Sequence, residues 1–211
     1  TYNGSNPYKT PGNMSLIPHL EMNYGTFIPK GGMHQISQSL YKLAVSQGIR
    51  FKFEEEVKEI ILHKNSATGV VTDKAKYDAA IVVSKMDIYP TYKKLLPTRK
   101  HPDKILKQER SSSALIFYWG ISKTFSELDL HNIFFSENYN EEFNAIFEEK
   151  KICNDPTIYI NITSKDVPED APKGHENWFV MINAPGNYGQ DWDSFKQLAR
   201  KTIIEKLSRI L

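Results

Sequence analysis

The sequence predicts a mixed α/β chain, of the α+β kind, built in two parts. From residue 111 onward, strand patterns rich in aromatic residues alternate with helical patterns, which favours helices packed on a mixed, largely antiparallel sheet. Residues 77–84 form an apolar run that is typical of a parallel-sheet strand covered on both faces. The 211 residues are 40% hydrophobic and 25% charged, so the chain can bury a core.

The first half of the chain contains one clear helix and a set of strands. Apolar residues recur at helical spacing over 32–47, and Gly48 follows where a left-handed cap costs least. Residues 49–53 alternate apolar and charged, which predicts a half-buried strand. A further strand is expected at 57–62, and 68–72 can pair with it as a hairpin.

The apolar run at 77–84 predicts a buried strand. In open α/β sheets, such strands bring their carboxyl ends to a ligand crevice. Asp87, which follows, can cap a short helix that tolerates Pro90 in its first turn.

The second half has the pattern of an antiparallel sheet with helices. The expected elements are strands at 111–122 and 131–136, a helix from Asn138, strands at 157–164 and 177–185, and a helix from about Asp191. The apolar stripe of the last helix continues to Leu211 without a Gly or Asn cap, so we expect the chain to be a segment of something longer.

Composition excludes several classes of function. The net charge of +2, without a basic cluster interleaved with aromatic residues, argues against nucleic-acid binding. Cys153 is the only cysteine, so no internal disulfide can form and a reducing compartment is the simpler interpretation. No run of 18 apolar residues predicts a membrane span, and the sequence predicts no signal peptide. The six histidines show no helical pairing, so no metal site is predicted.

Gly31 and Gly32 stand where a strand turns into a helix, a position at which many proteins hold phosphate. A dinucleotide-binding turn needs the three glycines of G-x-G-x-x-G, and only this pair is present. The helix end can still face an anion. On spacing alone, a plain turn is favoured over a phosphate site.

The order of these pieces resembles a known family. The stretch "SNPYKTPGNMSLIPHLEMNYGTFIPKGGMHQISQSLYKLAVSQGIRFKFEEEVKEI" is similar to the middle of the carotenoid desaturases, the bacterial phytoene desaturase (phytoene dehydrogenase) family of FAD-dependent oxidoreductases. The resemblance continues through "AAIVVSKMDIYPTYKKLLP", "SSSALIFYWGI", "HNIFFSENYNEEFNAIF", "DPTIYI" and "APKGHENWFVMINAP". Lys85 departs from the family, which often has Asn there.

The resemblance implies a domain division and a cofactor. Residues 29–86 would be a returning segment of a Rossmann-like FAD-binding domain, and residues 1–28 and 87–211 most of a substrate-binding domain. The family's G-x-G-x-x-G turn and its flavin-closing segment would lie outside the matched region. The candidate cofactor-binding positions are Gly31 and Gly32, as the turn between the domains, and Val57, whose backbone would meet the adenine ring.

The implied activity is desaturation of phytoene or a related polyene, by hydride transfer to the flavin. Three alternatives stay open: a carotenoid isomerase, a later-step desaturase, or a non-catalytic module for an apolar ligand. About half of a set of strand aromatics should line the substrate tunnel, namely Phe117, Trp119, Phe134, Phe135, Tyr159, Trp178 and Phe179. No catalytic residue is assigned. His175 and Glu176 match a family motif, but anchoring a loop explains them equally well.

The resemblance also predicts where the protein works. Carotenes dissolve in the bilayer, so a cytoplasmic protein that touches a membrane surface without spanning it is expected. The helix around residues 10–21 is a candidate contact face or a buried helix. Exposed faces of the strand at 77–84 would favour a homo-oligomer. The 211 residues alone are expected not to hold FAD.

Overall fold

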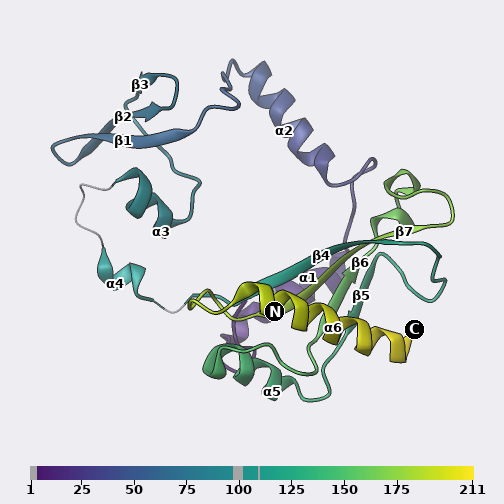
Figure 1. The fold of residues 1–211 in the computed structure, drawn as a ribbon. Coiled ribbons are helices and arrows are strands. Elements are labelled where there is room, and N and C mark those ends of the chain that lie inside the picture. The colour runs from purple at the N-terminus through teal and green to yellow at the C-terminus, as the bar shows by residue number, and fades with distance from the viewer. Residues whose placement is uncertain (1–3, 97–101, 109) are drawn as a thin grey trace. The chain divides into compact units, whose positions relative to one another are not determined.

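The computed structural model describes residues 4–96, 102–108 and 110–211, and Figure 1 shows its elements in chain order. The chain divides into two compact units. The first unit comprises Thr1–Ser39 and Arg110–Leu211, and the second comprises Leu40–Glu109. The fold is therefore of the predicted α/β class, with helices and antiparallel sheets. The domain boundaries expected from the resemblance stay a prediction.

A four-stranded antiparallel sheet is the centre of the first unit. Its order is β4-β7-β6-β5, so the two longest strands lie side by side. Tyr118 pairs with Phe179 between β4 and β7, and Tyr159 pairs with Met181 between β6 and β7. The strands are β4 (Ser113–Ile121), β5 (His131–Phe134), β6 (Ile158–Asn161) and β7 (Glu176–Ala184).

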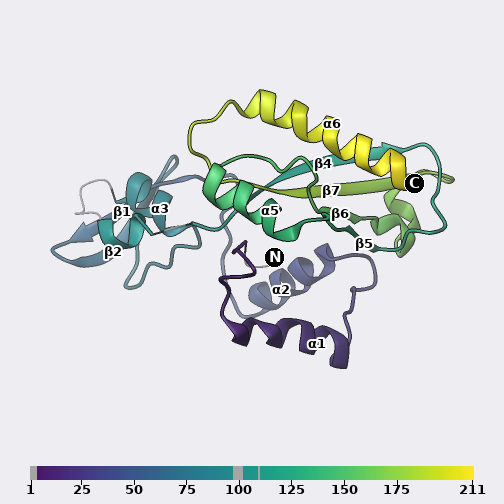
Figure 2. The same ribbon diagram turned by 90° about the horizontal axis from the view of Figure 1, so that it is seen from below.

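Helix α6 (Trp192–Ile210) runs along one face of this sheet (Figure 2), and α5 (Tyr139–Asn144) is tied to the ends of β5 and β6 by hydrogen bonds from Ser136 and Thr157 to Glu142. Asn138 caps α5 by accepting a hydrogen bond from the Glu141 amide, and Asp191 caps α6 through the amides of Asp193 and Ser194. A π-helical turn at Ala145–Glu149 continues α5. All these elements confirm the predicted strands and helices of the second half.

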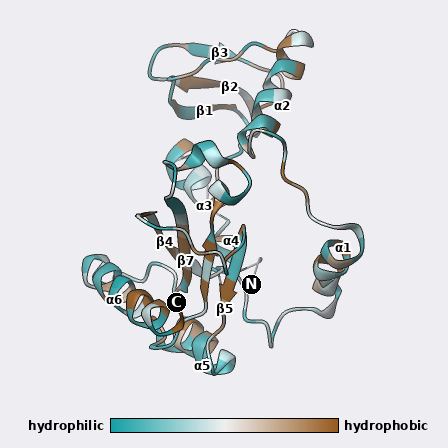
Figure 3. Cartoon of the chain, turned by 90° about the vertical axis from the view of Figure 1, so that its right-hand side faces the viewer, coloured by the Kyte–Doolittle hydropathy of each residue, from teal (hydrophilic) through white to brown (hydrophobic). Residues whose placement is uncertain are grey.

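The hydrophobic core lies between α6 and the sheet. Hydrophobic residues of α6 gather on its sheet-facing side in Figure 3. Ala199 and Ile203 of this helix are fully buried. From the strands, Ile160, Val180 and Ile182 meet them. This interleaving of a helix stripe with alternate strand positions is the packing that the sequence pattern predicts.

The amino-terminal segment belongs to the same unit. The Gly4 carbonyl accepts a hydrogen bond of 2.7 Å from the Ser112 amide just before β4. A 3₁₀ turn at Gly12–Ser15 leads into α1 (Leu16–Tyr24), which buries no residue. Two further 3₁₀ turns, Thr163–Lys165 and Pro168–Asp170, connect β6 to β7.

Helix α2 (His34–Ser46) runs from the first unit into the second and confirms the predicted helix. In the second unit, β1 (Val57–His63), β2 (Ser66–Thr72) and β3 (Lys76–Asp78) form an antiparallel sheet in that order. Gly69 is required here, because a Cβ would lie 2.2 Å from the Tyr77 carbonyl oxygen. The other elements are α3 (Ile88–Pro90), capped by Asp87 as predicted, a π-helical turn at Thr91–Leu95, and α4 (Asp103–Leu106).

Two strand predictions in this unit are wrong. The strand expected at 77–84 ends at Asp78, and Ile81 and Val83 beyond it are 80% and 87% exposed. Residues 49–53 form no strand, although Phe51 and Phe53 stack on each other. A strand forms only where a neighbouring strand completes its hydrogen bonds, and the described residues supply none at either place.

The hairpin between β1 and β2 is confirmed, with a shorter turn than expected. His63 pairs with Ser66, so only Lys64 and Asn65 remain between the strands. Lys64 has a φ of 56°, the left-handed conformation that two-residue hairpin turns favour.

Candidate functional site: the two faces of the four-stranded sheet

Strand alternation divides the aromatic residues of the four-stranded sheet between its two faces. In β7, Trp178, Val180 and Ile182 point into the core, whereas Phe179 and Met181 point the other way and are half-buried. Because neighbouring strands are paired in register, each strand contributes side chains to both faces. We call the side away from α6 the open face.

Aromatic rings cross the open face from one edge of the sheet to the other, one from each strand. Tyr118 of β4 meets Phe179 of β7 edge to face, with ring centres 5.6 Å apart. Phe179 meets Tyr159 of β6 at 6.3 Å, and Tyr159 stacks on His131 of β5 at 6.0 Å. These four residues are called the aromatic row.

One end of the aromatic row is polar. The Tyr159 hydroxyl and His131 Nδ1 lie 2.8 Å apart, within hydrogen-bond distance. The side-chain amide of Asn161 lies 3.2 Å from the same ring nitrogen and donates to the Leu130 carbonyl. At the opposite end, Tyr118 is 80% exposed. The row therefore offers an apolar surface with a hydrogen-bonded histidine and tyrosine at one end and the exposed Tyr118 at the other.

The structure separates the predicted tunnel residues. Tyr159 and Phe179 lie in the aromatic row. Phe117, Trp119 and Phe134 are half-buried against the core, and Trp178 is buried within it. Phe135 is exposed beyond the end of β5 and contacts Tyr139. Tyr118 was missed by the sequence prediction, although its position opposite Phe179 follows once the register of the two strands is known.

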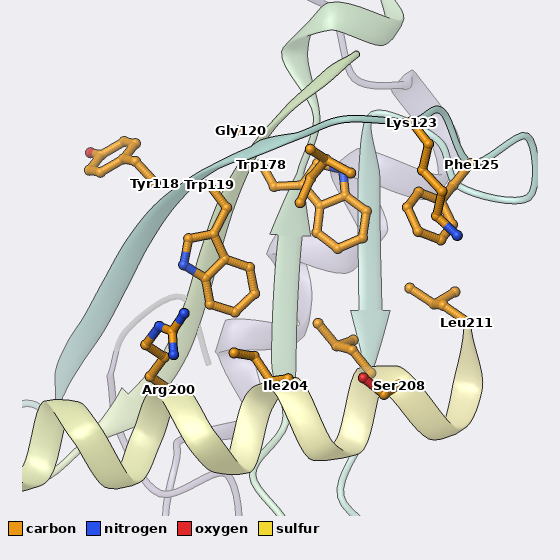
Figure 4. Close-up of a pocket in the computed structure, with 12 residues that line it drawn as sticks. Tyr118, Trp119, Gly120, Lys123, Phe125, Trp178, Arg200, Ile204, Ser208 and Leu211 are labelled. Atoms are coloured by element: carbon orange, nitrogen blue, oxygen red, sulfur yellow. The ribbon is translucent and has the colours of Figure 1, made fainter. Parts of the chain in front are cut away.

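A pocket of about 660 Å³ lies on the other side of the sheet, between β4 and α6 (Figure 4). Its centre is apolar, with Trp119 and Trp178 from the strands and Ile204 and Leu207 from the helix. The pocket exists because β4 is the edge strand and the half-buried side chains on its helix side are only partly covered. The remaining lining residues are Tyr118, Gly120, Ile121, Lys123, Phe125, Arg200, Ser208 and Leu211.

Glu176 holds the wall of this pocket in place. Its carboxylate, 3% exposed, accepts hydrogen bonds from the Phe125 amide at 3.0 Å and from Trp178 Nε1 at 2.8 Å. Lys165 Nζ lies 2.8 Å from the same group. Burial acts to raise the pKa of Glu176, but the hydrogen bonds from Lys165, Trp178 and Phe125 outweigh it and lower the pKa. The loop-anchoring interpretation of Glu176 thus matches its contacts.

The predicted cofactor positions have the following geometry. Gly31 and Gly32 have φ values of 84° and 86°, and the Gly32 amide donates to the Pro29 carbonyl, so the pair forms a turn before α2. Val57 begins β1, the edge strand of its sheet. An edge strand has backbone donors and acceptors that face away from the sheet, which suits a planar ring such as adenine. The role of these three residues in cofactor binding stays a prediction.

Other kinds of site find no support within 4–96, 102–108 and 110–211. In these ranges, no three His, Cys, Asp or Glu side chains gather as metal ligands would. Burial raises the pKa of the Cys153 thiol, which disfavours the reactive thiolate. None of the helices described is long and apolar enough to cross a membrane.

Comparison with family models and solved structures bears on the fold of the chain. No protein-family model matches the chain. Among solved structures, an oxidoreductase from Methanosarcina mazei superposes with a TM-score of 0.59 at 15% identity, over 90% of this chain and 42% of that one. The fold is therefore shared with part of an oxidoreductase.

Curated relatives match most or all of the chain. A 1-hydroxycarotenoid 3,4-desaturase from a Flavobacterium species is 60% identical over 211 residues, which is all of this chain and 43% of the relative. A phytoene desaturase from Fusarium fujikuroi is 34% identical over 96% of the chain and 40% of its own length. A 4,4'-diapolycopene oxygenase from a Methylomonas species is 36% identical over 87% of this chain and 37% of its own length. The chain is homologous to part of these carotenoid desaturases and oxygenases and spans about two fifths of their length.

Proposed function

We propose that this chain is the substrate-binding part of a flavin-dependent carotenoid desaturase. The relatives named for desaturation of phytoene and of a hydroxycarotenoid match it along nearly its entire length, which supports this class of substrate. The observation that carries the proposal is the aromatic row, an apolar strip on a sheet face that α6 leaves uncovered.

The shape of the aromatic row suits a polyene. Neighbouring strands are about 4.8 Å apart, so four side chains, one on each strand, span about 14 Å. A conjugated chain is long, flat and apolar, and it gains free energy by lying across ring faces and edges that exclude water. Tyr118, Phe179 and Tyr159 would form the wall along which the chain lies.

The His131 end of the aromatic row would orient the bound polyene. The Tyr159 hydroxyl and His131 Nδ1 could receive a hydroxyl group at the end of a polyene, while Tyr118 and Phe179 contact its hydrocarbon part. A hydroxylated polyene would then bind more tightly than its hydrocarbon counterpart, because a substrate hydroxyl would exchange its water hydrogen bonds for protein ones. This preference fits the hydroxycarotenoid named for one relative.

FAD is the proposed cofactor of the whole protein. When bound, it would accept a hydride from a C–H bond next to a double bond. Within this chain, the edge backbone of β1 at Val57 would hold the adenine, and Gly31 and Gly32 would form the turn that leads from one domain to the other. The open face would orient the polyene and keep water from the reacting carbons. Catalytic residues are not assigned.

We also propose peripheral contact with a membrane, through α1. Leu16, Leu20 and Met22 on this helix are 59%, 47% and 85% exposed, and a bilayer would cover such side chains. Flotation with phospholipid vesicles tests this contact. Replacing Leu16 and Leu20 by Ser should reduce flotation of the protein, and unchanged flotation would remove α1 from the proposal.

The activity is tested with the full-length protein that contains these residues, supplied with FAD and a polyene. A desaturase converts the polyene into a product with two hydrogens fewer and a red-shifted spectrum. An isomerase gives a product of the same mass, and a binding module gives no conversion. Either result would overturn the proposed reaction.

A variant series tests the site itself. Phe179→Ala removes the ring at the centre of the row and should lower kcat/KM about tenfold, because one aromatic contact contributes roughly 0.5–1.5 kcal/mol beyond its area. Phe27→Ala is the matched control, since Phe27 is 88% exposed and lies outside the sheet. Equal effects of both variants would exclude the open face as the substrate wall.

A further inference from the structure

The pocket between β4 and α6 is a second site, which shares Tyr118 with the proposed polyene wall. It opens on the face of the sheet that carries the core, whereas Phe179 and Tyr159 point to the opposite face. Its volume of about 660 Å³ lies within the range of small-molecule pockets, which are mostly apolar with a few converging polar groups. Polar groups converge at one end of it.

Two hydrogen-bond donors face each other at this end. In Figure 4 the guanidinium of Arg200 and the indole nitrogen of Trp119 point toward one another across the mouth of the pocket. The indole nitrogens of Trp178 and Trp192 donate to Glu176 and Asn187. For Trp119 Nε1 and for Arg200, no acceptor or carboxylate partner lies among the residues that the structure describes.

The middle of the pocket is apolar. Trp178, Ile204 and Leu207 line the middle, and Phe125 and Leu211 close the other end. Lys123 is also at that end, but its ammonium lies 4.0 Å from the centre of the Phe125 ring and is engaged in a cation–π contact. The two ends therefore differ: the Arg200 end presents a guanidinium and an indole N–H, whereas the far end presents the Ser208 hydroxyl and a lysine that is engaged with Phe125.

We propose that this pocket binds a single-chain amphiphile with a carboxylate head, such as a fatty acid. The carboxylate would accept hydrogen bonds from Arg200 and Trp119 Nε1, and the alkyl chain would extend past Trp178 and Leu207 toward Leu211. A guanidinium binds a carboxylate through two parallel N–H donors, which fixes the head group. A free inorganic anion would leave the apolar walls unused. This proposal does not depend on the proposed desaturase function.

The test uses the 211-residue chain and dodecanoate brominated at its terminal carbon, at concentrations below micelle formation. Bromine quenches tryptophan on contact, and two of the three tryptophans line the pocket. We expect saturable quenching, with affinity rising roughly fourfold for each methylene added to shorter chains. Dodecanol with the same bromine label should bind at least tenfold more weakly, because it lacks the charge.

Variants locate the head group. Arg200→Gln should weaken dodecanoate binding about 10- to 100-fold and leave dodecanol binding unchanged, whereas Arg200→Lys should restore part of the loss. Trp119→Phe keeps the ring and removes only the donor, so a smaller loss is expected. Arg209→Gln is the matched control, because Arg209 is an exposed arginine of the same helix outside the pocket lining. Circular dichroism verifies that each variant is folded.

Three results would overturn the proposal. Equal binding of dodecanoate and dodecanol would show that the head group is not recognised. Equal effects of Arg200→Gln and Arg209→Gln would show a general attraction between charges. Loss of dodecanoate binding in Phe179→Ala, together with no loss in Arg200→Gln, would move the amphiphile to the open face.

Discussion

The two units contain similar apolar patterns but bury them very differently. In the first unit, Ile160 and Val180 are completely buried between the sheet and α6. In the second unit, Ile81 and Val83 are 80% and 87% exposed, although their sequence pattern is at least as apolar. Within its described residues, the buried hydrophobic side chains of the second unit are Ile60 and Leu95. A hydrophobic pattern thus shows which face needs a partner, and the partner decides whether that face is buried.

The largest expected effect on stability comes from a core substitution in the first unit, compared with a substitution in the second. Ile203→Ala removes a completely buried side chain of α6 and should lower the free energy of unfolding of the first unit by about 2–5 kcal/mol. Val83→Ala removes an exposed side chain and should change stability by no more than about 0.5 kcal/mol.

Urea denaturation followed by tryptophan fluorescence reports the first unit, because Trp119, Trp178 and Trp192 all lie in it. Amide hydrogen exchange of β1–β3 reports the second. A loss of protection in β1–β3 for Val83→Ala would mean that this side chain is covered in solution, and the contrast between the units would fail.

The next effect contrasts ion pairs of the two units. Glu176→Gln weakens a buried carboxylate that holds Lys165, Trp178 and the Phe125 amide, and should lower the free energy of unfolding by about 2–3 kcal/mol. Glu56→Gln removes an exposed partner of Lys58 in the second unit and should produce no measurable change. Urea midpoints of the two variants decide the comparison, and equal midpoints would contradict it.

Acid should act on the first unit through two lowered pKa values. Burial acts to raise the pKa of Asp155, but the hydrogen bonds from Lys206 and the Glu137 amide outweigh it and lower the pKa; the pKa of Glu176 is lowered as well. The unfolded chain therefore binds protons at a higher pH than the folded one. Stability from both groups is complete above their ordinary pKa values, about 4, and is lost as the pH falls through the folded values.

The measurement is the free energy of unfolding by urea between pH 7 and pH 3. It should be constant at the upper end of this range and fall below about pH 5, by at most about 1.4 kcal/mol per pH unit for each group. Glu176→Gln should reduce the slope. A stability that rises on acidification would contradict the assignment.

The sequence predicts the first unit well because each apolar pattern there finds a partner strand or helix within the same unit. β4, β5, β6, β7, α5 and α6 lie where alternation and helical spacing put them, and Asn138 and Asp191 cap the helices as their residue types indicate. The strands at 49–53 and 77–84 fail because their apolar residues have no neighbouring strand among the described residues. The periodicity of a segment does not show whether a neighbouring strand is present.

The sequence alone predicts only part of the candidate site. Aromatic composition picks out Tyr159 and Phe179, but it cannot separate them from Trp119 and Trp178 on the other face, since the register decides which residues share a face. The place of Tyr118 on the open face and the presence of Arg200 and Trp119 at one pocket depend on tertiary structure. Neither has a signal in the sequence apart from residue type.

The smallest expected effect concerns the flavin, and it involves Val57 of the second unit and the glycine turn before α2. In the 211-residue chain, the candidate contacts are Val57, Gly31 and Gly32, and the Gly32 amide already donates to the Pro29 carbonyl. Fixing a cofactor costs about 4–15 kcal/mol of lost freedom, which so few backbone contacts do not offset. Excess FAD should therefore separate from this chain on gel filtration and leave its thermal midpoint unchanged. The full-length protein, treated in parallel, should stay yellow. A stoichiometric yellow complex of the 211 residues would show that this part of the family holds the flavin without the remaining three fifths of its relatives' length.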